Sequence, residues 1–221
     1  MGELSTLIQN NSFNQTLILE AFAEYLNNAS FNRIKSFLDA VPDLRYEVVD
    51  KRFYIMPSPS PLHQIGGGLI SAQLNHQLSS HNCLTAQALD IRLFPNQLND
   101  YICPDIMVIC NQNIINEYIQ DPYKPLEGVP GFIIEILSPS NAQHDLVTKR
   151  ELYLKAQVPE YWIIDILSDK PVLRQFVLDT KEVLPVYHES VHDAKGTIPI
   201  TTIPGCVIDF DKVFQKPHLR L

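Results

Sequence analysis

Two hydrophobic rhythms follow one another along the chain. Through residue 41, apolar side chains recur at the three- and four-residue spacing of a helix, as at Leu19, Phe22 and Leu26. After Pro42 the apolar residues gather in short runs bounded by turn residues, which is typical of buried strands. The pattern therefore predicts a helical segment over residues 1–41, a sheet-containing domain over 42–214 and a tail over 215–221.

The second part of the chain alternates between predicted strands and helices. A hairpin is expected over residues 45–56 and a helix with one apolar side over 62–78. The remaining runs predict strands at 86–94, 102–109, 132–137, 161–166 and 172–178, and a helix at 141–156. A strand, a helix and a strand in this order indicate a crossover between parallel strands. We therefore expect the α/β (α+β) class, with a mixed sheet flanked by helices.

Composition narrows the class of protein. Of the 221 residues, 45% are hydrophobic, enough for a sizeable core, and the apolar runs are far shorter than the ~18–20 residues of a membrane span. The N-terminus has no secretory-signal pattern, so we expect a cytoplasmic protein without a membrane partner. The net charge of −8 argues against non-specific attraction to nucleic acid over the whole surface, but it leaves a local basic groove open.

The cysteines suggest no special chemistry. They occupy positions 83, 103, 110 and 206, without a Cys-x-x-Cys pair. In a cytosolic chain such scattered cysteines are usually small core residues rather than metal ligands or disulfides. We therefore expect four free thiols.

One segment matches a zinc-protease pattern by its letters. His188 and His192 flank a Glu189-Ser-Val stretch, as in His-Glu-x-x-His. That motif binds zinc only on a helix, where residues four apart share a face. The surrounding residues indicate a strand end running into a turn instead. A chance match is therefore expected, and a zinc peptidase is the least favoured function.

Two acids interrupt apolar strand runs. Asp105 follows Pro104 at the start of one run, and Glu135 lies inside the next. A carboxylate in an apolar strand is costly unless something compensates its charge. Two such acids on neighbouring strands could share a divalent cation, for which magnesium or manganese suits oxygen ligands. Separate pairing of each acid with an arginine or a loop is the open alternative.

A lysine on the following helix favours a shared cation site over separate pairing of the two acids. Asp145 and Lys149 are four residues apart, so a helix places them on one face, and Lys149 interrupts an apolar stripe. From there the lysine could reach the two acids. A metal, two acids and a lysine suit phosphodiester hydrolysis. The alternative is an ordinary solvated ion pair.

The order of these motifs resembles a known family. Pro104-Asp105, Glu135-Ile-Leu-Ser-Pro-Ser, Asp145-x-x-x-Lys149 and Val158-Pro-Glu-Tyr-Trp are similar to the motifs of restriction endonucleases with the Uma-two domain, within the PD-(D/E)xK nuclease superfamily. Further similarity lies in Tyr46-Glu-Val-Val-Asp-Lys, Met56-Pro-Ser-Pro and Gly205. The resemblance covers roughly residues 42–214 and implies a restriction-endonuclease-like core. Lys51 and Gln157 depart from it, because the family commonly has glycine at both places.

The resemblance also implies roles for individual residues. Asp105 and Glu135 are expected to bind Mg²⁺ or Mn²⁺, with the main-chain carbonyl of Ile136 and the carboxylate of Glu47 as further ligands. Lys149 takes the place of the lysine that the superfamily carries two residues after the second acid, where this chain has Leu137. His63, Gln64 and Asp145 are expected to bind substrate or to support the catalytic groups.

The expected function is a metal-dependent endonuclease that hydrolyses DNA. Cleavage of both strands needs two active sites, so a homodimer is expected. The alternative is a nuclease-fold binding or assembly module with weak or no hydrolytic activity, which the acidic net charge favours. Retention of both acids and the lysine favours the enzyme.

Overall fold

The chain divides into two compact units. The computed structural model describes residues 31–41, 44–56, 58–97, 100–123, 126–138, 142–166, 170–181 and 183–213. The units are Met1–Pro57 and Ser58–Leu221. The helical pattern predicted before residue 31 and the tail at 215–221 lie outside the described residues. The predicted domain boundaries stay a prediction.

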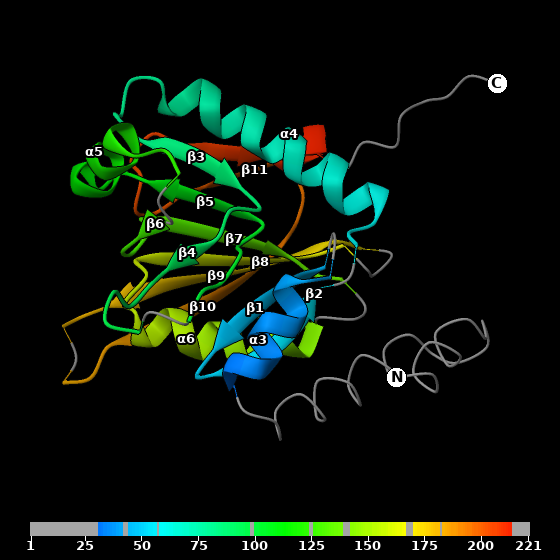
Figure 1. Ribbon diagram of the computed structural model, residues 1–221. Helices are drawn as coiled ribbons and strands as arrows, with labels where there is room; N and C mark the ends of the chain where they lie inside the picture. Colours follow the sequence, from blue (N-terminus) through cyan, green and yellow to red (C-terminus); the bar gives the residue numbers. More distant parts are fainter. Residues whose placement is uncertain are drawn as a thin grey trace, which may run out of the picture. The chain divides into compact units, whose positions relative to one another are not determined.

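The first unit contains a helix and a hairpin. Its elements are α3 (Phe31–Asp39), β1 (Arg45–Val49) and β2 (Arg52–Met56), shown in blue in Figure 1. The two strands pair antiparallel, which confirms the predicted hairpin. Asp50 and Lys51 have φ of 48° and 63°. Two left-handed residues make the tight turn whose twist suits a hairpin, although neither is glycine.

A six-stranded mixed sheet forms the second unit's centre (Figure 1). Its strands, in spatial order, are β10 (Val186–Asp193), β9 (Val172–Asp179), β8 (Glu160–Asp165), β7 (Phe132–Ile136), β5 (Ile106–Ile109) and β3 (Leu84–Gln87). Only β7 and β8 are parallel neighbours in this sheet, and the other pairs are antiparallel. The connection between them contains η1 (His144–Lys149) and α6 (Arg150–Lys155). This is the predicted crossover.

Smaller elements complete the second unit. They are α4 (Pro61–Leu78), α5 (Gln112–Gln120), α7 (Phe210–Val213), and the pairs β4 (Ile91–Arg92) with β6 (Leu126–Glu127) and β11 (Thr197–Pro199) with β12 (Val207–Asp209). The predicted helix at 62–78 is confirmed, but its predicted apolar side is not one buried face: Leu74 and Leu78 are buried, whereas Ile65 and Leu69 are exposed. The strand predicted at 86–94 is instead split into β3 and β4, because Ala88 takes a left-handed φ of 47° that ends the extended run.

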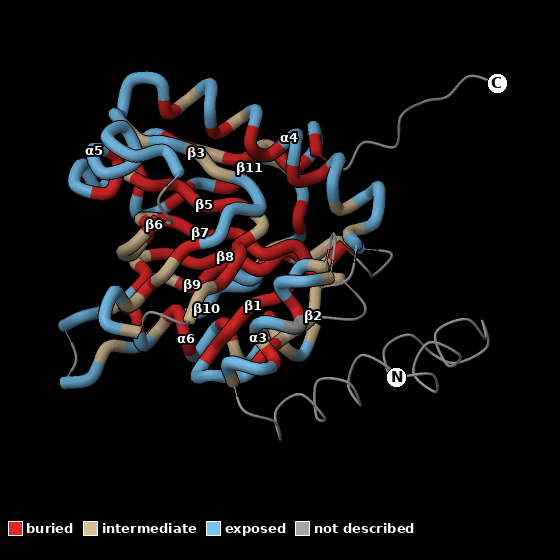
Figure 2. The backbone as a smooth tube through the Cα atoms, viewed as in Figure 1, coloured by how far each residue is buried: buried red, intermediate tan, exposed pale blue. Residues whose placement is uncertain are grey.

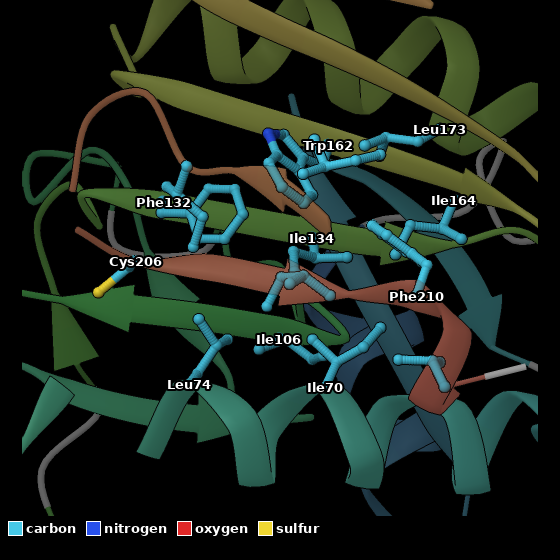
Figure 3. Packing of buried hydrophobic residues seen from close by; sticks show 14 of the residues in the cluster. Ile70, Leu74, Ile106, Phe132, Ile134, Trp162, Ile164, Leu173, Cys206 and Phe210 are labelled. Atoms are coloured by element: carbon cyan, nitrogen blue, oxygen red, sulfur yellow. The ribbon is translucent and has the colours of Figure 1, made fainter. Parts of the chain in front are cut away.

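The main core lies on the α4 side of the sheet. Ile134 of β7 and Trp162 of β8 pack there with Ile70 and Leu74 of α4 and with Phe210 (Figure 3). The central strands are buried along their length (Figure 2). Because strand side chains alternate between faces, the neighbours of these core residues point to the opposite face. Glu135, the neighbour of Ile134, contacts side chains of η1 and α6 there.

Two predictions about the second unit have clear outcomes. Cys83 and Cys110 form a disulfide, so the prediction of four thiols is wrong for this pair, while Cys103 and Cys206 are buried and keep their thiols. The antiparallel pairing of β3 with β5 brings the two cysteines together. Leu84 and Ile109 are partners, and Cys83 and Cys110 occupy the next pair of positions in the same register. The zinc-like segment lies on β10, where residues four apart are about 13 Å apart. This geometry confirms the expected chance match.

Within the described residues, none of the helices combines the length and the apolar character needed to cross a bilayer.

Candidate active site

Asp105 and Glu135 come together through the pairing of β5 with β7. Ile106 and Ile134 are partners in this antiparallel ladder. Extending the register by one residue places Asp105 opposite Glu135, and side chains at such positions have Cβ atoms ~4.5–5.5 Å apart on one face of the sheet. The two acids predicted from separate strand runs therefore share one site.

The carboxylate of Asp105 accepts a hydrogen bond from the main chain of β7. Pro104 occupies the register position opposite Ile136, and because it has no N–H it offers no donor to the Ile136 carbonyl. The N–H of Ile136 donates to the Asp105 side chain, at 2.7 Å from Oδ2. Because the N–H and C=O of a strand residue point to the same side, the Ile136 carbonyl is directed toward the same strand edge as this N–H.

His63 contacts the same oxygen of Asp105. It lies in the first turn of α4, which Ser60 caps by accepting a hydrogen bond from the His63 N–H at 3.2 Å. His63 Nε2 is 3.1 Å from Asp105 Oδ2. Burial acts to lower the pKa of His63, but the hydrogen bond and negative charge of Asp105 outweigh it, and the pKa is raised. His63 Nδ1 is buried and has no hydrogen-bond partner within the described part of the chain.

Glu135 is held from the other side by the crossover helix. Lys149 Nζ donates to Glu135 Oε1 at 3.1 Å, and the Tyr153 hydroxyl donates to the same oxygen at 2.6 Å. All three residues are buried, with at most 2% of each exposed. The buried carboxylate is thus compensated by one cation and one neutral donor.

The helix that carries these donors begins with a π-helical turn. Asp145 and Lys149 lie in η1, and Tyr153 follows in α6. Lys149 Nζ is 3.3 Å from Asp145 Oδ1, so the ammonium pairs with two carboxylates. π-Helical turns are rare and occur frequently at functional sites. Here Asp145, Lys149 and Tyr153, spaced by four residues, all belong to one buried cluster.

Several contacts fix the position of this helix. The Tyr161 hydroxyl of β8 donates to the Asp145 carbonyl at 3.0 Å. At the C-terminal end, Val158 N donates to the Tyr153 carbonyl and Gln157 N to the Leu154 carbonyl, both at 2.9–3.0 Å. This is a Schellman ending, and Gln157 has the left-handed φ of 57° that it requires. The backbone at both ends of the donor segment is therefore anchored.

The donor set fits a hard cation better than zinc. No group of three or more His, Cys, Asp or Glu side chains suited to a metal ion occurs among the described residues. Mg²⁺ is commonly held by one or two carboxylates, with water and substrate oxygens completing its shell. Asp105 and Glu135 provide two carboxylates, and the Ile136 carbonyl lies at the same edge of β7. With their carboxyl groups ionised, Asp105, Glu135 and Asp145 outnumber Lys149, which favours a cation electrostatically.

The structure unites most of the predicted site residues. Contacts join His63 to Asp105 and join Lys149 to Glu135 and Asp145, and the extended β5–β7 register relates the two groups. Gln64 is exposed on α4 beside His63, and its substrate role stays a prediction. Glu47 lies on β1 of the first unit, so its role as a metal ligand also stays a prediction.

One residue of the cluster was not predicted. Tyr153 fits the apolar stripe of the helix at 141–156, and tyrosine on such a stripe is normally core. The available signal was its spacing, because it stands one helical turn after Lys149 on the same face.

Comparisons with known proteins identify a family and a similar fold. The family model described as "Uma2: Putative restriction endonuclease" matches residues 31–201. A solved structure described as a "putative nuclease belonging to DUF820" from Anabaena variabilis ATCC 29413 is similar, with a TM-score of 0.62 and 18% sequence identity over 81% of this chain and 96% of that chain. At this identity the likeness shows the fold, and it confirms the predicted class. A comparison with curated proteins finds no match.

Proposed function

The chain belongs to the Uma2 family of restriction-endonuclease-like proteins, and on this premise we propose that it is a Mg²⁺-dependent endonuclease that hydrolyses DNA. The observation that carries the proposal is the buried contact of Lys149 with Glu135. Glu135 is the residue that the extended β5–β7 register places opposite Asp105. Two acids on neighbouring strands and a lysine on the crossover helix are the groups that phosphodiester hydrolysis with one cation needs.

The proposed metal ligands are the carboxylates of Asp105 and Glu135 and the carbonyl of Ile136, with Mn²⁺ as a substitute for Mg²⁺. A cation bound there would supply a water of lowered pKa and would offset phosphate charge. Asp105 Oδ2 is already held by Ile136 N and by His63, which fixes how the carboxylate is turned. The protein therefore orients this ligand before any ion binds.

Lys149 is the proposed electrostatic catalyst. Its ammonium is buried between Glu135 and Asp145, where a charge interacts more strongly than in water. Beside a phosphate it would stabilise the negative charge that develops in the transition state. Asp145 keeps the lysine on the side of the helix that faces Glu135, so its proposed role is to position Lys149.

His63 is the proposed substrate contact. Its Nε2 is engaged by Asp105, while its buried Nδ1 has no partner within the described residues. A phosphate oxygen, or water bound to one, is the kind of group that would pair with this atom. Gln64, exposed on the same turn, is proposed to contact DNA beside it.

We propose that the enzyme acts as a homodimer in the cytoplasm. Two sites related by a twofold axis are the simplest way to cut both strands of a duplex. The alternative of a binding or assembly module without hydrolysis is favoured by the net charge of −8, which repels the DNA backbone.

Cleavage of supercoiled plasmid separates the two functions. With Mg²⁺ the wild type should convert the plasmid to open-circular and linear forms, and Asp105→Asn and Glu135→Gln should each lose this activity. Glu151→Gln is the matched control, because Glu151 is an exposed acid on the same crossover helix. Wild-type activity that survives in both acid variants would contradict the proposal. DNA binding without cleavage by the wild type would favour the module.

A further inference from the structure

We propose that Tyr153 is a positioning residue that sets the orientation of the Glu135 carboxylate and keeps it in place when Lys149 engages substrate. The inference rests on the proposed function and adds a residue that the acids and the lysine do not imply. Tyr153 does not touch reacting atoms in this scheme. It acts through Glu135, to which its hydroxyl donates at 2.6 Å.

The two donors on Glu135 differ in how firmly they are placed. Lys149 reaches Oε1 at the end of a flexible chain and divides its ammonium between Glu135 and Asp145, at 3.1 and 3.3 Å. Tyr153 has a rigid ring with two rotatable bonds, and none of its surface is exposed. The tyrosine is therefore the donor whose position the fold determines.

Aromatic packing holds the Tyr153 ring. It packs edge-to-face with the Tyr161 ring, with ring centroids 4.7 Å apart and an interplanar angle of 66°. Tyr161 in turn stacks on Phe176 at 5.6 Å. Tyr161 belongs to β8 and Phe176 to β9, both strands of the sheet that carries Glu135. Packing against side chains of the sheet therefore fixes the position of the Tyr153 hydroxyl relative to Glu135.

This arrangement has a consequence for turnover. A lysine that turns toward a phosphate gives up part of its contact with Glu135. Without a second donor, the buried carboxylate would lose its compensation and rotate toward another partner. With Tyr153 on Oε1, one oxygen stays fixed, and fixing one oxygen fixes the direction of the other. Loss of the hydroxyl should therefore weaken both cation binding and the chemical step.

Tyr153→Phe removes the hydroxyl and keeps the ring. The matched control is Tyr187→Phe, which also deletes a buried tyrosine hydroxyl, one that donates at 2.8 Å to the Val158 carbonyl and touches no acid of the site. Mn²⁺ affinity is measured by titration calorimetry, and kcat and KM by plasmid cleavage. Measurements are made at a temperature at which thermal melts show every variant folded.

We expect Tyr153→Phe to weaken Mn²⁺ binding by about 10–100-fold, the usual effect of losing a group that orients a metal ligand. Its kcat should fall by at least about tenfold, while KM for DNA stays near the wild-type value, because the fully buried Tyr153 acts on Glu135 and does not contact substrate in the proposed scheme. Tyr187→Phe should match the wild type in both measurements. This split between the variants is not expected from a merely structural tyrosine.

Each contrary result has a distinct meaning. If the wild type binds no Mn²⁺ and cleaves no DNA, the proposed function fails, and the role of Tyr153 fails with it. If the wild type binds and cleaves but Tyr153→Phe equals it, the inference is overturned while the proposed function stands. If Tyr153→Phe and Tyr187→Phe lose affinity and kcat alike, the effect is structural and the inference is again wrong.

Discussion

Lys149 Nζ lies 3.1 Å from Glu135 Oε1 and 3.3 Å from Asp145 Oδ1, so one buried ammonium serves two buried carboxylates. Removing a single partner of a buried ion pair leaves an uncompensated charge, which is far more costly than the pair itself is stabilising. Lys149 is therefore important for stability as well as for the proposed chemistry, and the two roles must be measured separately.

Replacement of Lys149 by methionine tests both roles. Turnover in plasmid cleavage should fall by about 10²–10³, the scale of losing one preorganised electrostatic contact. The free energy of unfolding in guanidinium should fall by about 3–5 kcal/mol, because Glu135 and Asp145 lose their cation. Lys155→Met is the control, since Lys155 is an exposed lysine of the same helix. Undiminished cleavage by Lys149→Met would show that catalysis uses another cation.

The disulfide should contribute measurably to stability. Cys83 and Cys110 are separated by 27 residues. Closing a loop of this size lowers the conformational entropy of the unfolded chain, which raises the free energy of unfolding by about 3–4 kcal/mol. Reduction with dithiothreitol should lower the free energy of unfolding by roughly this amount. The same reductant should not affect the double variant Cys83→Ser/Cys110→Ser.

A thiol titration in denaturant provides the direct check on this bond. It should find two reactive thiols before reduction, Cys103 and Cys206, and four afterwards. Disulfides are rare in the cytosol, so four thiols in protein purified under cytosolic conditions would mean that the bond is absent there.

Stability should fall at alkaline pH because of buried tyrosines. Burial raises the pKa of the Tyr187 hydroxyl well above its ordinary value, although the charge of Arg150 opposes this shift. Above pH ~10 the unfolded chain loses this proton while the folded chain keeps it, so the unfolded state binds fewer protons and unfolding becomes easier as pH rises. One such group lowers the free energy of unfolding by up to about 1.4 kcal/mol per pH unit.

Comparison with Tyr187→Phe isolates this effect. The variant lacks one titrating hydroxyl, so its free energy of unfolding should fall less steeply between pH 10 and pH ~11.5. Urea unfolding at several pH values measures both slopes. Parallel curves for the wild type and the variant would contradict the assignment.

Gln157 offers a site where glycine should stabilise the protein. Its φ of 57° costs a residue with a Cβ about 1 kcal/mol or more, and glycine avoids this cost at the price of a more flexible unfolded chain. We expect Gln157→Gly to raise the free energy of unfolding by about 0.5–1 kcal/mol without changing cleavage. Gln143→Gly, at a right-handed position before η1, should destabilise instead. A loss of stability in Gln157→Gly would mean that the side chain has a role of its own.

Parts of the fold with a strong local signal could be predicted from the sequence. The extent of the hairpin at 45–56 and of the helix at 62–78 follows from periodicity and turn residues, but the side of the helix that is buried does not. The helix at 112–120 was not predicted, although Ile114, Ile115, Tyr118 and Ile119 recur at helical spacing, because the pattern spans only nine residues. The π-helical turn within 141–156 was not foreseen either, since six residues do not distinguish its period from that of an α-helix.

The site divides in a similar way. Asp105, Glu135 and Lys149 could be predicted because a charge within an apolar run stands out in the sequence. Tyr153 could not, because a buried tyrosine suits a core, and only the three-dimensional direction of its hydroxyl distinguishes the two roles. The Cys83–Cys110 bond depends on which residues of β3 and β5 become partners. That register is set by the whole sheet rather than by the residues near either cysteine.

The π-helical turn restricts how the length of this chain can change during evolution. Insertion or deletion of one residue between Asp145 and Tyr153 would rotate everything beyond it by about 100° and carry the later donors away from Glu135. A substitution in this stretch alters one side chain, whereas a length change would remove the cluster as a whole. Alignment gaps among active relatives should therefore fall outside residues 145–153, and in this interval spacing is a stricter criterion than residue identity.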